Sequence, residues 1–151
     1  MNKIILALIS LLCISTGSAQ TTWQMVGKIK KDTPLLTLDK EAALKAFNTN
    51  ISTSTEIIEN FTDVFLRQAE DGNYVLVFKG AVYTGSFLVK KKSKKLIALT
   101  STSCILNSDS TAITGCKVLY DGENFPYCSP CSSENECMKV SSSASLIESK
   151  H

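Results

Sequence analysis

The stretch NYVLVFKGAVYTGSFLVKKKSKKLIALTSTSC, residues 73–104, decides the fold of this chain. Three short runs rich in β-branched and aromatic residues, 73–82, 84–91 and 95–104, are separated by glycine or by a lysine-rich tip at 90–95. Such runs, each bounded by turn residues, are typical of antiparallel strands that are joined by tight turns. The stretch therefore predicts an up-and-down antiparallel meander.

The residues before this meander are ambiguous between helix and strand. Between 52 and 70, apolar residues recur at helical spacing, but the run Val64–Leu66 is β-prone. Asp71-Gly72 then separates this segment from the next apolar run, and an Asp-Gly pair in that position is a strong hairpin signal. We therefore predict a strand at 61–69, after a loose turn at 52–58.

A helix is predicted further towards the N-terminus, at 40–48. Asp39 precedes it and can cap it, because its carboxylate can accept a hydrogen bond from an unpaired amide of the first turn. The segment KEAALKAF consists of strong helix formers, with Ala43, Leu44 and Phe47 on one face. A first strand is predicted at 23–31, and Asp-Thr-Pro at 32–34 is expected to break it.

These elements together predict an α+β domain. Its body, 20–103, would be a small antiparallel meander sheet of about four or five strands with one N-terminal helix packed on a face. A Cys-rich loop region, 104–140, would follow as an extension of the same domain, with a strand at 116–120 only. Residues 141–151 would form a polar tail.

The first nineteen residues have the parts of a secretory leader. Lys3 gives a positive start, residues 4–14 form an apolar run, and Gly17 and Ala19 are small residues where a signal peptidase reads. The apolar run is shorter than the roughly 20 residues that a membrane-spanning helix needs. We therefore expect cleavage after Ala19 and an exported protein, periplasmic or secreted, with no transmembrane span once this signal peptide is removed.

Cysteines are concentrated in the second half of the expected mature chain. Disulfides are the default for cysteines in an exported protein, and five cysteines allow two bridges and one free thiol. Cys104 could face Cys116 across a hairpin, and Cys137 lies close in sequence to Cys128, so we expect these two pairs to be bridged. The five candidates are Cys104, Cys116, Cys128, Cys131 and Cys137.

The segment Tyr127-Cys128-Ser129-Pro130-Cys131 allows two other kinds of chemistry. Over these five residues it resembles the thioredoxin active-site motif, and that resemblance implies a thiol–disulfide oxidoreductase. The thioredoxin scaffold continues with further strands and a helix, and only twenty residues follow Cys131, so we expect no redox activity. Cys-x2-Cys can also supply half of a zinc site, with Cys104 and Cys116 completing it. We expect a covalent role for the cysteines, and no metal or other cofactor.

The candidates for catalysis are few. Ser–His–Asp and Cys–His sites need a positioned imidazole, and the single histidine is His151. Glu56, Glu59 and Asp63 are the nearest candidates for a catalytic carboxylate pair, but their spacing also fits a solvated helix face or loop. We therefore predict that the protein is not an enzyme.

One block of charge suggests a partner. The chain as a whole has 16 basic and 14 acidic residues, which gives no argument for a nucleic-acid partner. A local block could contact lipid headgroups, a polysaccharide or another anionic envelope component, or simply keep a hairpin tip hydrated. It consists of Lys90, Lys91, Lys92, Lys94 and Lys95. The sequence thus predicts a small exported binding or cell-envelope protein that is stapled by disulfides, whose partner is a protein or such an anionic component.

Overall fold

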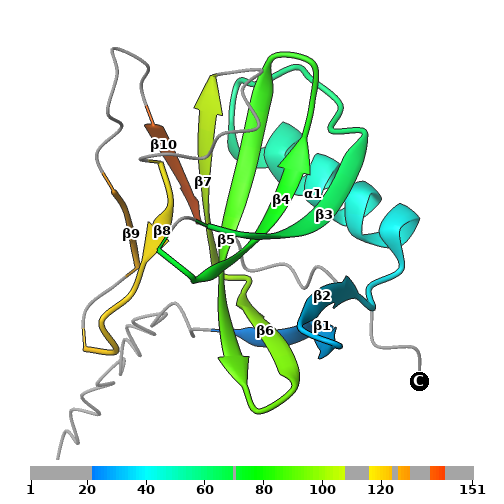
Figure 1. The fold of residues 1–151 in the computed structure, drawn as a ribbon. Helices are drawn as coiled ribbons and strands as arrows, with labels where there is room; N and C mark the ends of the chain where they lie inside the picture. The colour runs from blue at the N-terminus through cyan, green and yellow to red at the C-terminus, as the bar shows by residue number, and fades with distance from the viewer. Residues whose placement is uncertain (1–21, 70, 108–115, 124–125, 130–136, 142–151) are drawn as a thin grey trace, which may run out of the picture.

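The computed structural model describes residues 22–69, 71–107, 116–123, 126–129 and 137–141 (Figure 1). The predicted meander is present. Its strands are β3 (Asp63–Gln68), β4 (Tyr74–Lys79), β5 (Tyr83–Lys92) and β6 (Lys95–Leu99), each antiparallel to the next. The segment 52–69 is mixed, because the helix covers its first residues and β3 its last ones.

The predicted third run, 95–104, forms two strands instead of one. A turn at Thr100 and Ser101 interrupts the run, so β6 ends at Leu99 and β7 (Thr102–Asn107) follows as a separate strand. β5 is long enough to pair with both of them along the same edge: its first half pairs with β7 and its second half with β6. β4 occupies the other edge of β5.

The prediction of about four or five strands is wrong, because the main sheet has eight strands among the described residues and is nearly barrel-shaped. Its additional members come from both ends of the chain. β1 (Trp23–Lys30) and β2 (Thr33–Leu36) form a hairpin that pairs with β6, and β10 (Cys137–Ser141) pairs with β7. β2 was not predicted, because Asp-Thr-Pro suggested a break. Lys31 and Asp32 instead make a tight turn with φ values of 50° and 58°, and Pro34 lies in a strand at the edge of the sheet, where proline is tolerated.

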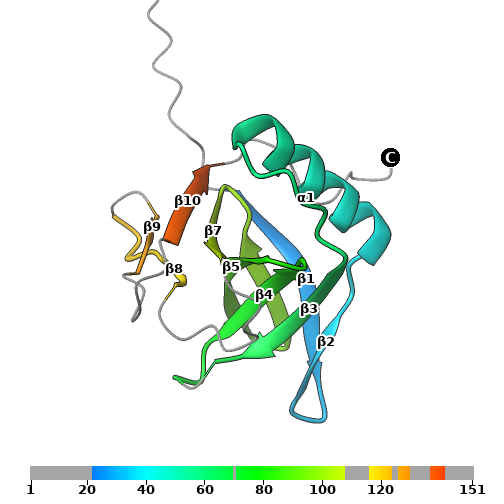
Figure 2. The ribbon, with the colours of Figure 1, turned by 90° about the horizontal axis from the view of Figure 1, so that it is seen from above.

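One helix, α1 (Lys40–Ser54), is present in the described part of the chain and covers one side of the sheet (Figures 1 and 2). Asp39 caps it as predicted, since its carboxylate accepts a hydrogen bond from the amide of Ala42 over 3.0 Å. The helix continues past the predicted end at residue 48. Its last turns bury Ile51, and the hydroxyls of Thr53 and Thr55 donate to carbonyls of the preceding turn.

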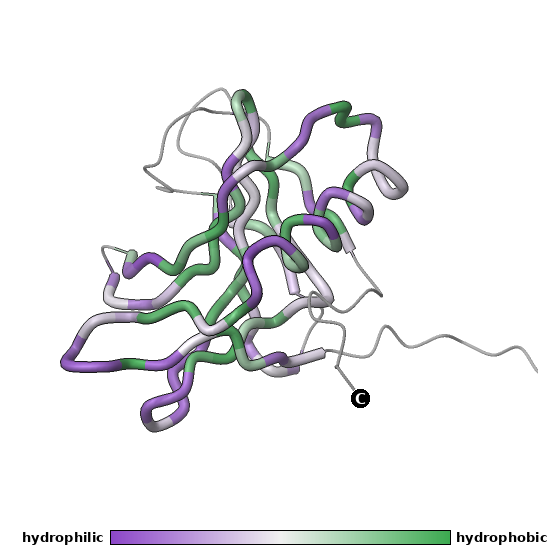
Figure 3. The backbone as a smooth tube through the Cα atoms, turned by 90° about the vertical axis from the view of Figure 1, so that its right-hand side faces the viewer, coloured by the Kyte–Doolittle hydropathy of each residue, from purple (hydrophilic) through white to green (hydrophobic). Residues whose placement is uncertain are grey.

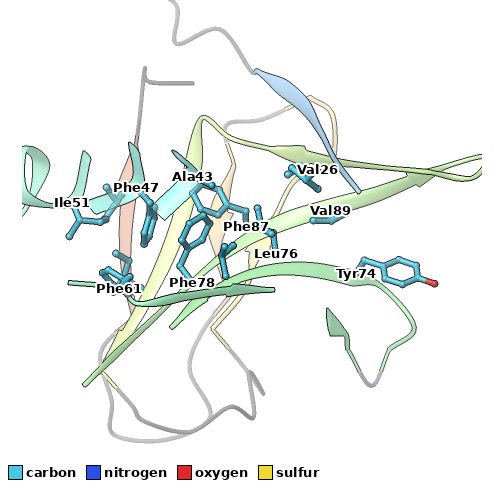
Figure 4. Close-up of a cluster of buried hydrophobic side chains, with 14 of the residues drawn as sticks. Val26, Ala43, Phe47, Ile51, Phe61, Tyr74, Leu76, Phe78, Phe87 and Val89 are labelled. Carbon is cyan, nitrogen blue, oxygen red and sulfur yellow. The ribbon is translucent and has the colours of Figure 1, made fainter. Parts of the chain in front are cut away.

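The core lies between α1 and the sheet, and phenylalanine rings fill it (Figure 4). The ring of Phe47 stacks on Phe78 at 4.2 Å between centroids and meets the edges of Phe61 and Phe87 at 4.8 and 5.6 Å. Gly85 makes room for this helix, because a Cβ there would lie 2.7 Å from Phe47 Cζ. The strands that meet this core are hydrophobic, whereas the ends of the projecting hairpins are hydrophilic (Figure 3).

A second, smaller cluster lies on the other side of the sheet from α1 (Figure 2). There β8 (Val118–Leu119) and β9 (Tyr127–Cys128) form a two-stranded ribbon. The predicted strand at 116–120 is therefore confirmed in its central residues, while β9 and β10 were not predicted. Val118 of this ribbon belongs to the same buried cluster as Leu99, Cys104 and Cys116.

Candidate functional site

Two hairpins bring lysines that are distant in sequence to one end of the sheet. β1 is antiparallel to β6, so the tip of the β1–β2 hairpin lies beside the tip of the β5–β6 hairpin. The amide of Ile29 donates to the carbonyl of Lys94 over 2.8 Å and joins the two tips. Asp32 is the single acidic residue in the sequence of these two hairpins. All their lysines are exposed: Lys28, Lys30, Lys31, Lys90, Lys91, Lys92, Lys94 and Lys95.

Three of these lysines stand in one cross-strand row. Lys92 is the register partner of Lys95, and Lys95 is the register partner of Lys28. Register partners point to the same face, and this face is opposite to the one on which the next residue, Leu96, is buried in the core. Like charges directly opposite one another destabilise a sheet. The row is therefore unfavourable for folding unless water or an anion screens it.

Apolar side chains lie on the same face as this row. Met25 is the register partner of Ile97 and is 50% exposed, and Leu35 is the register partner of Lys28 and is 45% exposed. Lys95 and Ile97 are two residues apart on β6 and so share a face. We call this surface the lysine face; it comprises Met25, Lys28, Leu35, Lys92, Lys95 and Ile97.

Lys90 borders the lysine face and has aromatic partners. It is the register partner of Ile97, and its ammonium lies 5.1 Å from the ring centroid of Trp23 and 5.3 Å from that of Tyr120. The two rings are 6.2 Å apart. Both distances from the ammonium are in the range of cation–π attraction. Lys90 thus links β5 to β1 and to the residue after β8.

Only part of this site could be recognised from the sequence. The lysine block at 90–95 was recognised because its members are contiguous, whereas Lys28, Lys30 and Lys31 were missed. These three lysines belong to the run KIKK in the first strand. They join the lysine block only because β1 pairs with β6. Met25, Leu35, Trp23 and Tyr120 were missed for the same reason.

The cysteines that the structure describes form two disulfides, but the predicted pairing, Cys104–Cys116 and Cys128–Cys137, is wrong. Cys104 is bridged to Cys128 with a Cα–Cα distance of 5.7 Å, and Cys116 to Cys137 with 5.9 Å. The prediction assumed that the chain after β7 returns beside it. The neighbours of β7 are β5 and β10 instead, and Cys104 has Ser86 and Lys139 as register partners. The bridges therefore join the β8–β9 segment to the main sheet.

The sulfur atoms of the two bridges lie close together. Those of Cys104, Cys128 and Cys137 are all within 4.8 Å of one another. A sulfur in a disulfide is not the thiolate that binds zinc or attacks a substrate, so in this state the bridged cysteines serve as covalent links. Cys128 is bridged to a distant strand and not within its Cys-x2-Cys motif. Cys131, which belongs to the thioredoxin-like and the zinc hypotheses, lies outside the described residues.

An ion pair also holds the β8–β9 ribbon to the sheet. The ammonium of Lys117, just before β8, donates to the carboxylate of Asp71 in the β3–β4 turn. This hydrogen bond, with a smaller contribution from the Asn73 amide, lowers the pKa of Asp71 from 3.8 to about 2. The carboxylate is therefore ionised at every pH at which the protein is expected to work.

Two of the three carboxylates considered for catalysis are engaged in other contacts. Glu59 accepts hydrogen bonds from the amides of Val82 and Tyr83, over 2.7 and 2.9 Å, and so fixes the β4–β5 turn. Asp63 accepts from the amide of Val64 and forms an exposed ion pair with Lys40 at 3.3 Å. Glu56 is exposed. These contacts indicate a structural role for Glu59 and Asp63.

A depression of about 310 Å³ lies between the end of α1 and the residues that follow it. Two of the polar side chains that line it, those of Asn48 and Glu59, are already engaged. Asn48 accepts from the amide of Phe61 over 2.8 Å and donates to its carbonyl over 3.0 Å, and Glu59 binds the β4–β5 turn. The depression is therefore a weaker candidate for a binding site than the lysine face.

Comparisons of the chain with protein-family models, curated protein sequences and solved structures give no match. Within the ranges that the structure describes, no helix has both the length and the apolar character needed to cross a membrane.

Proposed function

We propose that this protein is an exported, non-enzymatic binding module that docks an anionic component of the cell envelope on its lysine face. The single observation that carries the proposal is the cross-strand row Lys92–Lys95–Lys28. Three ammonium groups directly opposite one another weaken the sheet that bears them. An anionic partner would relieve that repulsion, so the arrangement favours binding over stability.

The surroundings of the row support the same proposal. Eight of the chain's 16 basic residues lie on the two hairpins, which carry a single acidic residue. Charge of one sign that is gathered on one end of a molecule attracts a partner of the opposite sign and speeds their encounter. The leader at residues 1–19 and the two disulfide bridges support export, because disulfides persist in oxidising compartments.

The proposal predicts the behaviour of the variant Lys28→Ser/Lys92→Ser/Lys95→Ser. Each lysine near an anionic surface contributes about 1 kcal/mol, so at low salt the variant should bind about a hundredfold more weakly to vesicles that contain phosphatidylglycerol. Dextran sulfate is a second probe, and elution from a column of it should need less salt. The free energy of unfolding should rise by no more than about 1 kcal/mol, because the repulsion within the row is relieved but exposed charges contribute little.

A matched control removes the same number of charges elsewhere. Lys40, Lys45 and Lys139 are exposed and lie on α1 and β10. Changing these three to serine should weaken binding only slightly, because the lysine face stays intact. The proposal fails if the parent binds neither probe at low salt, or if the control loses as much affinity as the lysine-face variant.

A further inference from the structure

The lysine face has an apolar part that electrostatic attraction alone does not use. Met25 and Leu35 are large apolar side chains, half exposed to water, and both lie beside the lysine row. Ile97 lies between Met25 and Lys90 in the register of β1, β6 and β5. A partner that covers this face must therefore accept ammonium groups and apolar side chains within the same few ångströms.

Possible anionic partners differ in whether they can accept both ammonium groups and apolar side chains. An acidic polysaccharide offers carboxylates or sulfates but no apolar phase for a methionine and a leucine. Single-stranded nucleic acid needs exposed aromatic faces for stacking, whereas the ammonium of Lys90 already lies over the rings of Trp23 and Tyr120. The boundary between lipid headgroups and acyl chains offers phosphate groups and hydrocarbon at adjacent depths.

The residues at the border of the face fit that boundary as well. Tryptophan and tyrosine are enriched at the level of lipid headgroups, where an apolar ring with a polar tip is stabilised. Trp23 is two residues from Met25 on β1, its ring lies 6.2 Å from that of Tyr120, and the ammonium of Lys90 lies over both rings. Lysine stems can cover apolar surface while their ammonium groups reach towards the phosphates.

We infer that the anionic component is a phospholipid bilayer surface, with Met25 and Leu35 inserted at the boundary of headgroups and acyl chains and the lysine row on the lipid phosphates. This inference rests on the proposed function and names its partner. It assigns separate work to the two kinds of side chain: the lysines provide salt-sensitive attraction, and the two apolar residues provide attachment that salt does not screen.

The test compares two variants of the full chain in a sedimentation assay with vesicles of phosphatidylglycerol and phosphatidylcholine. Met25→Ser/Leu35→Ser should lower the partition coefficient about tenfold or more at all salt concentrations, because each buried apolar side chain favours transfer out of water. The matched control is Val82→Ser/Met138→Ser, which removes apolar residues of the same exposure, 50% and 44%, away from the lysine face. The control should partition like the parent.

The single tryptophan gives a second readout. Trp23 is the only tryptophan in the chain, and it borders the lysine face. Its fluorescence should shift to shorter wavelength on binding to these vesicles and should be quenched by brominated lipid acyl chains, but neither effect should occur with dextran sulfate. Circular dichroism and the unfolding midpoint check that the variants are folded.

The outcomes separate this inference from the proposed function. If Met25→Ser/Leu35→Ser binds vesicles as the parent does while the lysine variant does not, insertion is refuted and anion binding stands. Tight, salt-sensitive binding to dextran sulfate without any binding to vesicles would also refute insertion and leave anion binding in place. If neither probe is bound at low salt, both the inference and the proposed function are wrong.

Discussion

At the scale of single residues, the contact between Gly85 and Phe47 is a close constraint in the core. A Cβ at residue 85 would lie 2.7 Å from Cζ and 3.1 Å from Cε1 of the Phe47 ring, which three other phenylalanines enclose. We expect Gly85→Ala to lower the free energy of unfolding by about 1 to 3 kcal/mol, because an overfilled core must shift. Urea denaturation followed by circular dichroism measures this change.

A double variant distinguishes crowding from a loss of backbone freedom. Phe47→Leu removes the ring atoms that the new methyl group would touch. In a Phe47→Leu background, Gly85→Ala should therefore cost much less than in the parent, so the two effects should not add. Equal costs in the two backgrounds would contradict the steric explanation.

At the scale of elements, Asn48 joins the helix to the sheet. Its side-chain amide bonds both the amide and the carbonyl of Phe61, just before β3, as a neighbouring strand would. Asn48→Ala leaves both groups without this partner, and we expect a loss of about 1 to 3 kcal/mol of unfolding free energy. Asn48→Asp keeps an acceptor for the amide but cannot donate to the carbonyl, so its loss should be intermediate. The exposed neighbour Thr49→Ala should change the unfolding midpoint little, and a loss as large as that of Asn48→Ala would argue against this role.

Elements with strong local signals could be predicted from the sequence, and elements whose partners are distant could not. The cap at Asp39 and the meander strands depend on neighbouring residues, and they are present. The end of α1 depends on hydroxyls that bond back into the helix and on burial of Ile51, which single-sequence propensity does not weigh. β10 is short and pairs with β7, which lies far before it in the chain. β2 and β9 pair with strands that are near in sequence, but Asp-Thr-Pro suggested a break before β2, and β9 has only two residues.

The same reason explains which residues of the candidate site could be recognised from the sequence and which could not. The block from Lys90 to Lys95 is contiguous and could be recognised, but its union with Lys28 depends on the pairing of β1 with β6. The cysteines could be assigned to disulfides from their number and expected compartment. Their pairing could not be assigned, because it depends on which strands flank β7.

At the scale of the whole molecule, the two disulfides hold the β8–β9 ribbon against the main sheet. We expect the loss of either bridge, in Cys104→Ser/Cys128→Ser or Cys116→Ser/Cys137→Ser, to cost about 2 to 4 kcal/mol of unfolding free energy. Mass spectrometry of peptides from the unreduced protein should find residue 104 linked to 128 and 116 linked to 137. Linked peptides that join 104 to 116, or 128 to 137, would contradict this architecture.

The position of β1 in the sheet also sets an order of folding. Trp23 pairs with Leu99, and every element from β2 to β6 lies between them along the chain. Contacts of such long sequence separation form slowly, because the entropy of a large loop is lost before the contact is gained. The meander from β3 to β6 can form from local contacts, but β1 can pair only after β6 has formed.

In a chain that crosses a membrane from its N-terminus, β1 would emerge first and pair late. Val26 and Ile29, which later meet the core, would then be exposed to other unfinished chains.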